Sequence, residues 1–311
     1  MKRLKIIIFL IILSNIFPVQ GSEDVKNLTI KALRDKKIPE NSINIEKKLG
    51  VRNGKYTSYL ISYYSENLNI YALMNIPLSK KPEKGYPVVL VNHGYIPPAR
   101  YSTVDSYRLV DGYFASNGFI TLKSDYRGHA SSDKGTNRPV DRMKYVLDVL
   151  YLTMAVGSID GADPGNIFMY GHSMGGEITL KALEISSNIK AASLWAPVTK
   201  RFPESMLYFV RKRSLSEAIN EKEKIERIFG KSNYSFFSPI DNISLIEAPL
   251  IIHHGTGDDS VPYNWSLELV EKLKESGVNY KFYTYDDDHN FAGRYFYVVL
   301  KRDVAFFKKY L

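Results

Sequence analysis

The sequence predicts an α/β fold, with a mostly parallel sheet, helices on both of its faces, an N-terminal β-hairpin and a small helical lid insertion. Three observations support this prediction. Short apolar runs alternate with longer runs of helical periodicity from residue 86 onward, two tyrosine-rich runs precede them, and the alternation is interrupted between Ala196 and Asn242. At 311 residues and 44% hydrophobic content, the chain can bury the core of such a sheet.

The predicted sheet begins with the hairpin. Residues 56–64 and 68–77 are rich in tyrosine and isoleucine, and the polar residues 65–67 lie between them. Residues 86–92 then form a continuous apolar run, which is typical of a strand buried on both faces of a parallel sheet.

Beyond this strand, helix-like and strand-like runs follow one another, as they do where crossover helices connect parallel strands. The further predicted strands cover residues 119–124, 167–170, 191–195, 250–254 and 280–285. The predicted helices cover residues 104–117, 142–156, 265–276, a run that starts at Ser173 and a run that starts near Arg294. Within the interruption, two amphipathic stretches at 204–211 and 215–229 are expected to form the lid.

The N-terminus has the pattern of a secretory signal peptide. A basic start at residues 1–5 precedes the nearly all-apolar residues 6–17, which are too few to span a membrane as an ordinary helix. The segment Val19-Gln20-Gly21 suits cleavage after Gly21. We therefore expect residues 1–21 to be removed and the protein to be secreted or periplasmic, without stable membrane association. An uncleaved N-terminal membrane anchor is the alternative.

The remaining chain is expected to have two parts. Residues 22–55 are polar and rich in lysine, with one helical candidate near residues 25–34, and should form an extension that lies on the main domain. Residues 56–311 should form the main domain, with the lid insertion at about 196–242.

The composition excludes several kinds of site. Cysteine is absent, so the chain has no disulfide, no thiolate metal ligand and no cysteine nucleophile. The formal net charge of +9 falls to +6 without the three basic residues among the first 21, and the other basic residues are mostly scattered, so no nucleic-acid partner is expected. The sequence contains no glycine-rich nucleotide motif and no haem signature, so no cofactor is expected.

A serine between two glycines marks the predicted active site. The segment Gly171-His172-Ser173-Met174-Gly175 has the form G-x-S-x-G between a predicted strand and a predicted helix, which is the setting of a nucleophile elbow. The turn is so tight that both flanking positions must be nearly free of side chain, and it exposes the serine hydroxyl at the positive end of the helix. Ser173 is the candidate nucleophile.

A serine nucleophile needs a base, a carboxylate that orients the base, and N–H donors for the oxyanion. In an open α/β sheet these groups must lie at the carboxyl ends of the strands. Asp258 and Asp259 follow one predicted strand and His289 follows the next, so they should reach the same edge as Ser173. The residues alone do not decide which aspartate is the acid. The other aspartate is expected to cap the turn or the next helix.

The order Ser, Asp, His, together with the elbow, resembles the α/β-hydrolase fold, and the similarity covers about residues 56–311. Four motifs are similar to the catalytic domain of the prolyl oligopeptidase group and of related bacterial esterases. They are Asn92-His93-Gly94-Tyr95, Asp125-Tyr126-Arg127-Gly128-His129, Gly171-His172-Ser173-Met174-Gly175-Gly176 and His254-Gly255-Thr256-Gly257-Asp258-Asp259-Ser260-Val261-Pro262. The resemblance implies that Asp258 is the acid and that the backbone amides of Tyr95 and Met174 form the oxyanion hole.

The other histidines are expected to have structural roles. His172 precedes the nucleophile and cannot turn back toward it. The remaining four belong to loop motifs, to a strand or to a glycine-serine loop: His93, His254, His253 and His129. Three consecutive aspartates at 286–288 do not predict a metal site, because carboxylates in an extended loop alternate in direction.

The first lid helix has an apolar stripe whose role the sequence leaves open. The stripe consists of Phe202, Met206, Leu207, Phe209 and Val210. It either lines the substrate pocket or packs the insertion against the domain.

These observations predict a secreted serine hydrolase that cleaves carboxylic esters through an acyl-enzyme, with Ser173, His289 and Asp258 as the triad. The expected partner is a small-molecule ester or a short peptide. The resemblance adds that peptide-cleaving members usually carry a large N-terminal β-propeller, and the extension is too short to be one.

Two alternatives remain. The first is a serine exopeptidase or amidase of the prolyl oligopeptidase type, whose free-amine anchor would need paired glutamates. Glu221, Glu223 and Glu226 of the lid have the spacing of an ordinary solvated face. The second alternative is a non-catalytic binding protein on the same fold, which would be expected to lack a member of the triad.

Overall fold

The computed structural model describes residues 23–135, 138–231 and 234–311, so the predicted signal peptide at 1–21 lies outside the described residues. The strands are β1 (Ile43–Arg52), β2 (Tyr56–Ser65), β3 (Leu68–Pro77), β4 (Tyr86–Asn92), β5 (Ile120–Ser124), β6 (Ala162–His172), β7 (Ala191–Trp195), β8 (Leu250–Gly255) and β9 (Tyr280–Tyr285). The helices are α1 (Glu23–Lys26), α2 (Ile30–Asp35), α3 (Arg108–Ser116), α4 (Arg138–Met154), α5 (Met174–Ile185), α6 (Glu204–Arg213), α7 (Leu215–Phe229), α8 (Tyr263–Glu275) and α9 (Phe296–Lys308).

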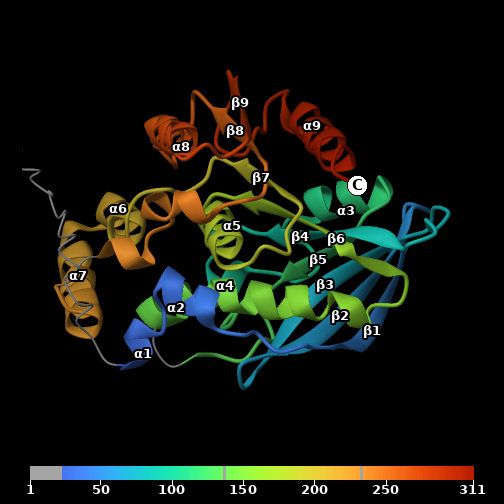
Figure 1. Cartoon of the computed structure of the whole chain (residues 1–311), viewed down its shortest axis with the longest axis horizontal. Coiled ribbons are helices and arrows are strands. Elements are labelled where there is room, and N and C mark those ends of the chain that lie inside the picture. Colours follow the sequence, from blue (N-terminus) through green and yellow to red (C-terminus); the bar gives the residue numbers. More distant parts are fainter. Residues whose placement is uncertain (1–22, 136–137, 232–233) are drawn as a thin grey trace, which may run out of the picture.

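The strands form one sheet in the order β1-β2-β3-β5-β4-β6-β7-β8-β9. The pairings from β1 to β5 through β2 and β3 are antiparallel, and those from β5 to β9 are parallel. Helices connect the parallel strands as crossovers and cover both faces of the sheet (Figure 1). The predicted α/β architecture, in which an antiparallel hairpin precedes a parallel sheet, is confirmed.

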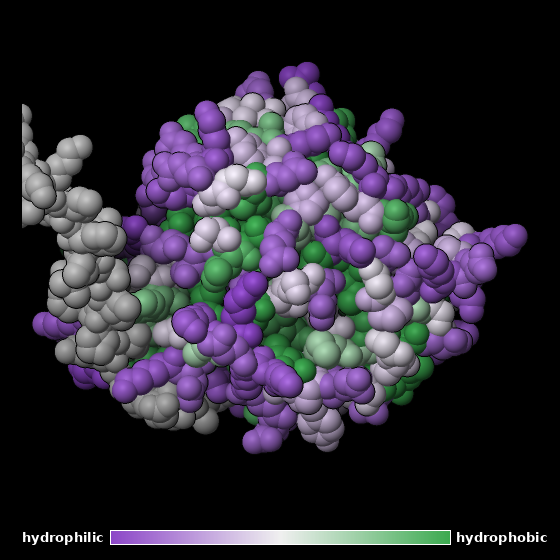
Figure 2. Space-filling model, viewed as in Figure 1, coloured by the Kyte–Doolittle hydropathy of each residue, from purple (hydrophilic) through white to green (hydrophobic). Residues whose placement is uncertain are grey.

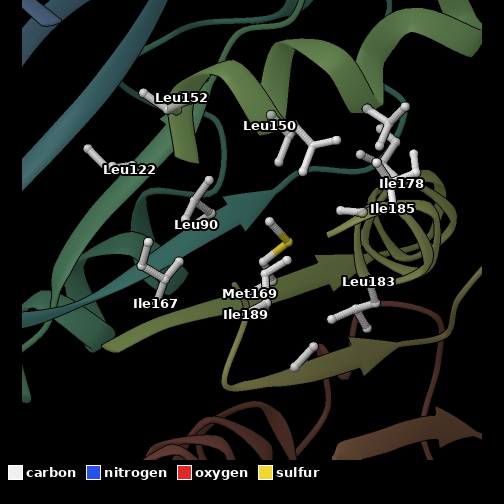
Figure 3. Packing of buried hydrophobic residues seen from close by; sticks show 14 of the residues in the cluster. Leu90, Leu122, Leu150, Leu152, Ile167, Met169, Ile178, Leu183, Ile185 and Ile189 are labelled. Atoms are coloured by element: carbon white, nitrogen blue, oxygen red, sulfur yellow. The ribbon is translucent and has the colours of Figure 1, made fainter. Parts of the chain in front are cut away.

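Alternate residues of the central strands enter two separate hydrophobic cores. In β4, Val88 and Leu90 belong to the core that α4, α5 and α8 cover, whereas Val89 and Val91 belong to the core that α3 and α9 cover. Figure 3 shows Leu90 and Met169 of the strands facing the apolar side chains of α4 and α5. Leu90 is 1% exposed, and its replacement by alanine should cost about 2–5 kcal/mol of stability. This packing fixes the strand ends that carry the candidate site.

The N-terminal extension differs from its expectation. Residues 43–52 form the edge strand β1, which pairs with β2, so the boundary expected at residue 55 falls inside a hairpin. The turn of this hairpin contains Asn53 and Gly54 at positive φ, 49° and 66°. The strand is hard to recognise because an edge strand faces solvent and is polar. The Asn-Gly pair is the signal in the sequence that marks the turn.

The lid packs against the first helices of the chain. Helices α6 and α7 lie together at one end of the molecule (Figure 1), and their shared core includes Phe202, Leu207 and Ile225. Val25 and Leu28, from the N-terminal segment, are buried in the same core. This contact ties the lid to the start of the described chain.

Hydrophilic side chains cover most of the face seen in Figure 2, and hydrophobic ones are seen mainly in the recesses between them. In the described ranges, no helix combines the length and the hydropathy needed to cross a membrane.

Candidate active site

Ser173 lies in the turn between β6 and α5, directly before the first residue of the helix, with φ 55° and ψ −118°. Non-glycine residues rarely adopt this conformation, and it persists only where neighbouring groups hold it. The Ser173 N–H donates to the carbonyl of Trp195 at 2.9 Å, and the Ser173 carbonyl accepts from the N–H of Val198 at 3.0 Å. These bonds fix the elbow to the end of β7.

The glycines of the elbow allow it to pack against neighbouring groups. A Cβ on Gly175 would lie 1.9 Å from the carbonyl oxygen of Asn92, and a Cβ on Gly171 would lie 2.3 Å from Oγ1 of Thr179. The turn therefore touches the end of β4 directly. A side chain at Gly175 would push Ser173 away from the loop that follows β4.

Asp258 and His289 form a direct hydrogen bond. The Nδ1–H of His289 donates to Oδ2 of Asp258 at 2.7 Å, while Oδ1 of Asp258 accepts from the N–H groups of Ser260 and Val261 at 2.8 and 2.9 Å. The Asp258 side chain is fully buried. Burial opposes its ionisation, but the hydrogen bonds from His254 and His289 outweigh this and hold the pKa of Asp258 well below its ordinary value. The carboxylate is therefore ionised and fixed on the base.

Ser173 and His289 line the same two cavities. Within the described residues the Ser173 hydroxyl makes no hydrogen bond, including none to Nε2 of His289. Contacts between nucleophile and base are often long without substrate and shorten in the reactive complex. The two side chains thus face shared cavities without a direct hydrogen bond between them.

Asp259 has a different environment from Asp258. Its side chain is exposed and accepts a hydrogen bond from the Ser260 hydroxyl at 3.2 Å, and its backbone carbonyl accepts from Lys212. The expectation that this second aspartate caps the turn or the next helix is wrong. Asp258 itself caps the turn, and α8 begins after Pro262 without a side-chain cap.

His254 makes a contact with Asp258 that the sequence does not reveal. Its Nε2–H donates to Oδ2 of Asp258 at 3.0 Å, so this oxygen is shared between His254 and His289. Its Nδ1 lies 2.6 Å from the hydroxyl of Ser266 in α8. The periodicity of β8 predicts a buried residue here, but not that it reaches four residues ahead to the carboxylate.

The two amides expected to bind the oxyanion are free to do so. Met174 is the first residue of α5, where an N–H has no partner inside the helix, and Tyr95 follows the turn after β4. Neither amide donates to another backbone group within the described chain. A Cβ on Gly94 would lie 3.2 Å from the Ser173 Cβ, so the Tyr95 loop lies beside the nucleophile.

The remaining histidines are packed, as expected. His172 is buried next to Ser173, and burial together with the nearby His289 lowers its pKa to about 3. His93 is stacked between Tyr101 and Tyr126, with ring centroids 4.6 and 4.2 Å away. The other two, His129 and His253, are also buried.

The acidic run at 286–288 shapes the loop that carries His289. Asp287 accepts from the backbone N–H groups of Asp288, Gly293 and Tyr295, and Asp288 accepts from those of Asn290 and Ala292. These carboxylates are therefore used to cap the loop.

Two cavities meet at Ser173, with Tyr95 and His289 also lining both. The smaller, of about 630 Å³, is bounded mainly by the start of α3 and by the residues around His289. The larger, of about 810 Å³, lies beneath the lid, and we call it the lid cavity. Such a pair of cavities can hold the two halves of a substrate on either side of a scissile bond.

The apolar stripe of the lid has both of the expected roles. Met206, Phe209 and Val210 line the lid cavity, whereas Phe202 and Leu207 are buried in the core between α6 and α7. One edge of the stripe therefore faces the lid cavity, and the other edge packs into the hydrophobic core of the lid.

Replacing Met206 or Phe209 by alanine should change kcat/KM unequally across esters of increasing acyl length, by about tenfold between the extremes, because the lid cavity becomes deeper. Leu207→Ala is the matched control, since it should lower stability by about 2–5 kcal/mol without altering the chain-length profile. Equal changes for all esters in Met206→Ala would contradict the lining role.

Comparison with known proteins gives a family and a fold. Residues 106–311 match the model of the prolyl oligopeptidase family. The chain is 27% identical over 226 residues to a probable dipeptidyl peptidase 4 of Aspergillus flavus and 28% identical over 264 residues to a probable dipeptidyl-aminopeptidase B of Coccidioides posadasii. These alignments cover 69% and 79% of this chain but only 27% of each relative.

Two solved structures share the fold. The acetyl xylan esterase from Paenibacillus sp. R4 has a TM-score of 0.66 at 18% identity, over 94% of this chain and 96% of that one. The dipeptidyl peptidase 4 of Porphyromonas gingivalis has a TM-score of 0.63 at 22% identity, over 83% of this chain and 36% of that one. At these identities the likeness is one of fold.

Proposed function

Because the chain belongs to the prolyl oligopeptidase family of serine hydrolases, we propose that it cleaves carboxylic esters through an acyl-enzyme formed on Ser173. The observation that carries this proposal is the 2.7 Å hydrogen bond between His289 and Asp258, at the sheet edge that also holds the strained Ser173 turn. A buried ionised carboxylate on Nδ1 leaves Nε2 of the same ring as the proton acceptor.

In the proposed reaction, Ser173 Oγ attacks the acyl carbonyl and transfers its proton to Nε2 of His289. Asp258 stabilises the imidazolium that forms, and the amides of Tyr95 and Met174 stabilise the oxyanion. The intermediate collapses as His289 returns the proton to the departing alcohol. Water, activated by the same histidine, then releases the acid from Ser173.

Two observations favour an ester as substrate. Met174, Val198 and Met206 line the lid cavity together with Ser173 and offer apolar contacts to an acyl or alcohol group, beside the charged residues of α4, α6 and α7 that also line it. The fold is also shared over nearly the whole chain with an acetyl xylan esterase.

A panel of p-nitrophenyl esters, hydroxycinnamate esters and aminoacyl anilides tests the proposal. We expect turnover of the esters, inactivation by a serine-directed organophosphonate, and no effect of chelators. Turnover of the anilides alone would reject ester hydrolysis and favour the second candidate.

The second candidate is an exopeptidase acting on short peptides with a free N-terminus. Glu217 and Glu221 both line the lid cavity, with Asn220 and Lys224 on the same face of α7. Of the glutamates expected to face solvent, Glu221 thus turns toward the cavity, while Glu223 is exposed. Two carboxylates one helical turn apart can bind an ammonium group.

If peptides are the substrate, Glu221→Gln and Glu217→Gln should each lower kcat/KM for an anilide with a free amine by about tenfold, the equivalent of one charge-assisted hydrogen bond. The same anilide with an acetylated amine should be unaffected. Glu223→Gln on the exposed face of α7 is the control. Equal rates for free and acetylated substrates in the unmodified protein would exclude an amine anchor.

We also propose that residues 1–21 export the protein as a cleaved signal peptide. The basic start followed by a short apolar run supports this proposal. N-terminal sequencing of protein recovered outside the cytoplasm should begin near Ser22, and retention of Met1 on a membrane fraction would favour the uncleaved anchor.

A further inference from the structure

A chain of hydrogen bonds joins the loop after β4 to the loop that carries His289. The N–H of Gly94 lies 2.8 Å from Oη of Tyr107, this hydroxyl lies 2.5 Å from Nδ1 of His172, and Nε2 of His172 lies 3.0 Å from the carbonyl oxygen of His289. His172 is the residue immediately before Ser173. The three segments that carry the proposed nucleophile, base and oxyanion donor are therefore connected through two side chains.

The direction of every bond in this chain is determined. The carbonyl of His289 can only accept, so Nε2 of His172 must carry the proton. His172 is neutral because burial and the nearby His289 lower its pKa to about 3, so its Nδ1 is an acceptor. Tyr107 must then donate to Nδ1, which leaves its oxygen to accept from the N–H of Gly94.

The surrounding backbone is built to permit these contacts. Tyr107 has a left-handed conformation with φ 61°, which is uncommon for a residue with a large side chain. A Cβ on Gly94 would lie 2.8 Å from the Tyr107 hydroxyl, so glycine is needed for the hydroxyl to approach this closely. Gly94 donates its N–H to Tyr107, whereas the adjacent N–H of Tyr95, a residue that lines the cavity, makes no hydrogen bond within the described residues.

From this geometry we infer that Tyr107 and His172 are positioning residues that hold the oxyanion amide of Tyr95 and the backbone of His289 at fixed places around Ser173. The inference rests on the proposed serine-hydrolase function. This series of hydrogen bonds acts before substrate binds, since all of the bonds exist in the free protein. It gives Tyr107 a role beyond lining the smaller cavity.

Tyr107→Phe tests the inference because it removes one oxygen and keeps the ring. We expect kcat for p-nitrophenyl acetate to fall about tenfold with KM nearly unchanged, less than the loss of a whole oxyanion donor, which costs about 100- to 1,000-fold. The affinity for a boronic acid that mimics the tetrahedral intermediate should fall by a similar factor. Both the lower kcat and the weaker binding of the boronic acid are expected because the Tyr95 amide is then held less firmly in position.

Tyr63→Phe is the matched control. The Tyr63 hydroxyl is also buried and bonds to the Ser124 hydroxyl at 2.7 Å and to the Asp148 carbonyl at 2.9 Å, away from the elbow. It should lower the melting temperature without changing kcat or boronic acid affinity. A structural role alone would make Tyr107→Phe behave in the same way, with a lower melting temperature and unchanged kcat, and would overturn the inference.

Two variants of His172 give an independent check. Glutamine offers one acceptor and one donor, so His172→Gln should keep more of the activity than His172→Leu, which offers neither. Equal activity of the two folded variants would overturn the inference.

Failure of the proposed function would have a different signature. In that case the unmodified protein would neither hydrolyse the ester nor be labelled at Ser173 by an organophosphonate. Labelling and turnover by the unmodified protein, with full activity in Tyr107→Phe, would reject only the positioning role.

Discussion

Replacing Ser173 by alanine is expected to lower kcat for a short-chain aryl ester by about 10,000-fold or more, while the melting temperature stays nearly unchanged. The large loss follows from removing the only proposed nucleophile. The small structural effect follows because the Ser173 hydroxyl makes no hydrogen bond within the described residues, and alanine tolerates the φ of 55° about as well as serine does.

The measurement is steady-state ester hydrolysis by the full-length protein, together with mass spectrometry after organophosphonate treatment. The unmodified protein should gain one phosphonyl group on Ser173, and the variant should gain none. Ser186→Ala, at the far end of α5, is a control that should keep both activity and labelling. Activity that survives in Ser173→Ala and disappears with a chelator would overturn the assignment.

The sheet could be predicted from the sequence where strands are buried on both faces. Residues 86–92 and 191–195 match β4 and β7, which are buried along their whole length. Residues 280–285 match β9, a partly buried edge strand whose aromatic run stands out between polar segments. Strand β6 begins at Ala162, whereas the prediction starts it at residue 167. The prediction is late because Asp163, Pro164 and Gly165 are residues that usually indicate a turn. The edge strand β1 lacks apolar alternation and could not be recognised in the same way.

The site was predictable to the extent that strand ends determine it. Parallel strands end at one edge, so the positions of Ser173, Asp258 and His289 after β6, β8 and β9 already imply proximity. The contact of His254 with Asp258 and the bonds of Tyr107 depend on side-chain direction and on the path of a loop. Neither is encoded in the periodicity of the sequence, because both are determined by the tertiary structure.

The Asp258→Asn variant should be nearly as damaging as the loss of the nucleophile, with kcat lowered by about 10,000-fold. Oδ1 of Asp258 accepts two backbone N–H groups, so the amide oxygen of asparagine should occupy that position and its NH₂ should face His289. Nδ1 of His289 must then accept a hydrogen bond, which moves the ring proton to Nε2. A histidine protonated at Nε2 cannot take the proton of Ser173.

The same substitution should also change the dependence of stability on pH. The pKa of Asp258 is lowered on folding, so its carboxylate contributes stability above about pH 4, and this contribution is lost as the pH falls further. Asparagine has no such titration, so the variant's melting temperature should vary less with pH in the acidic range. Thermal unfolding between pH 2 and pH 7 measures the difference.

Asp259→Asn is the matched control for Asp258→Asn, because it makes the same chemical change one residue away. The Asp259 side chain is exposed and accepts only from the Ser260 hydroxyl among the described residues, so stability should change by no more than about 0.5 kcal/mol and kcat should be nearly unaffected. A large kcat deficit in Asp259→Asn, combined with a small one in Asp258→Asn, would make Asp259 the acid and leave the roles proposed for Ser173 and His289 unchanged.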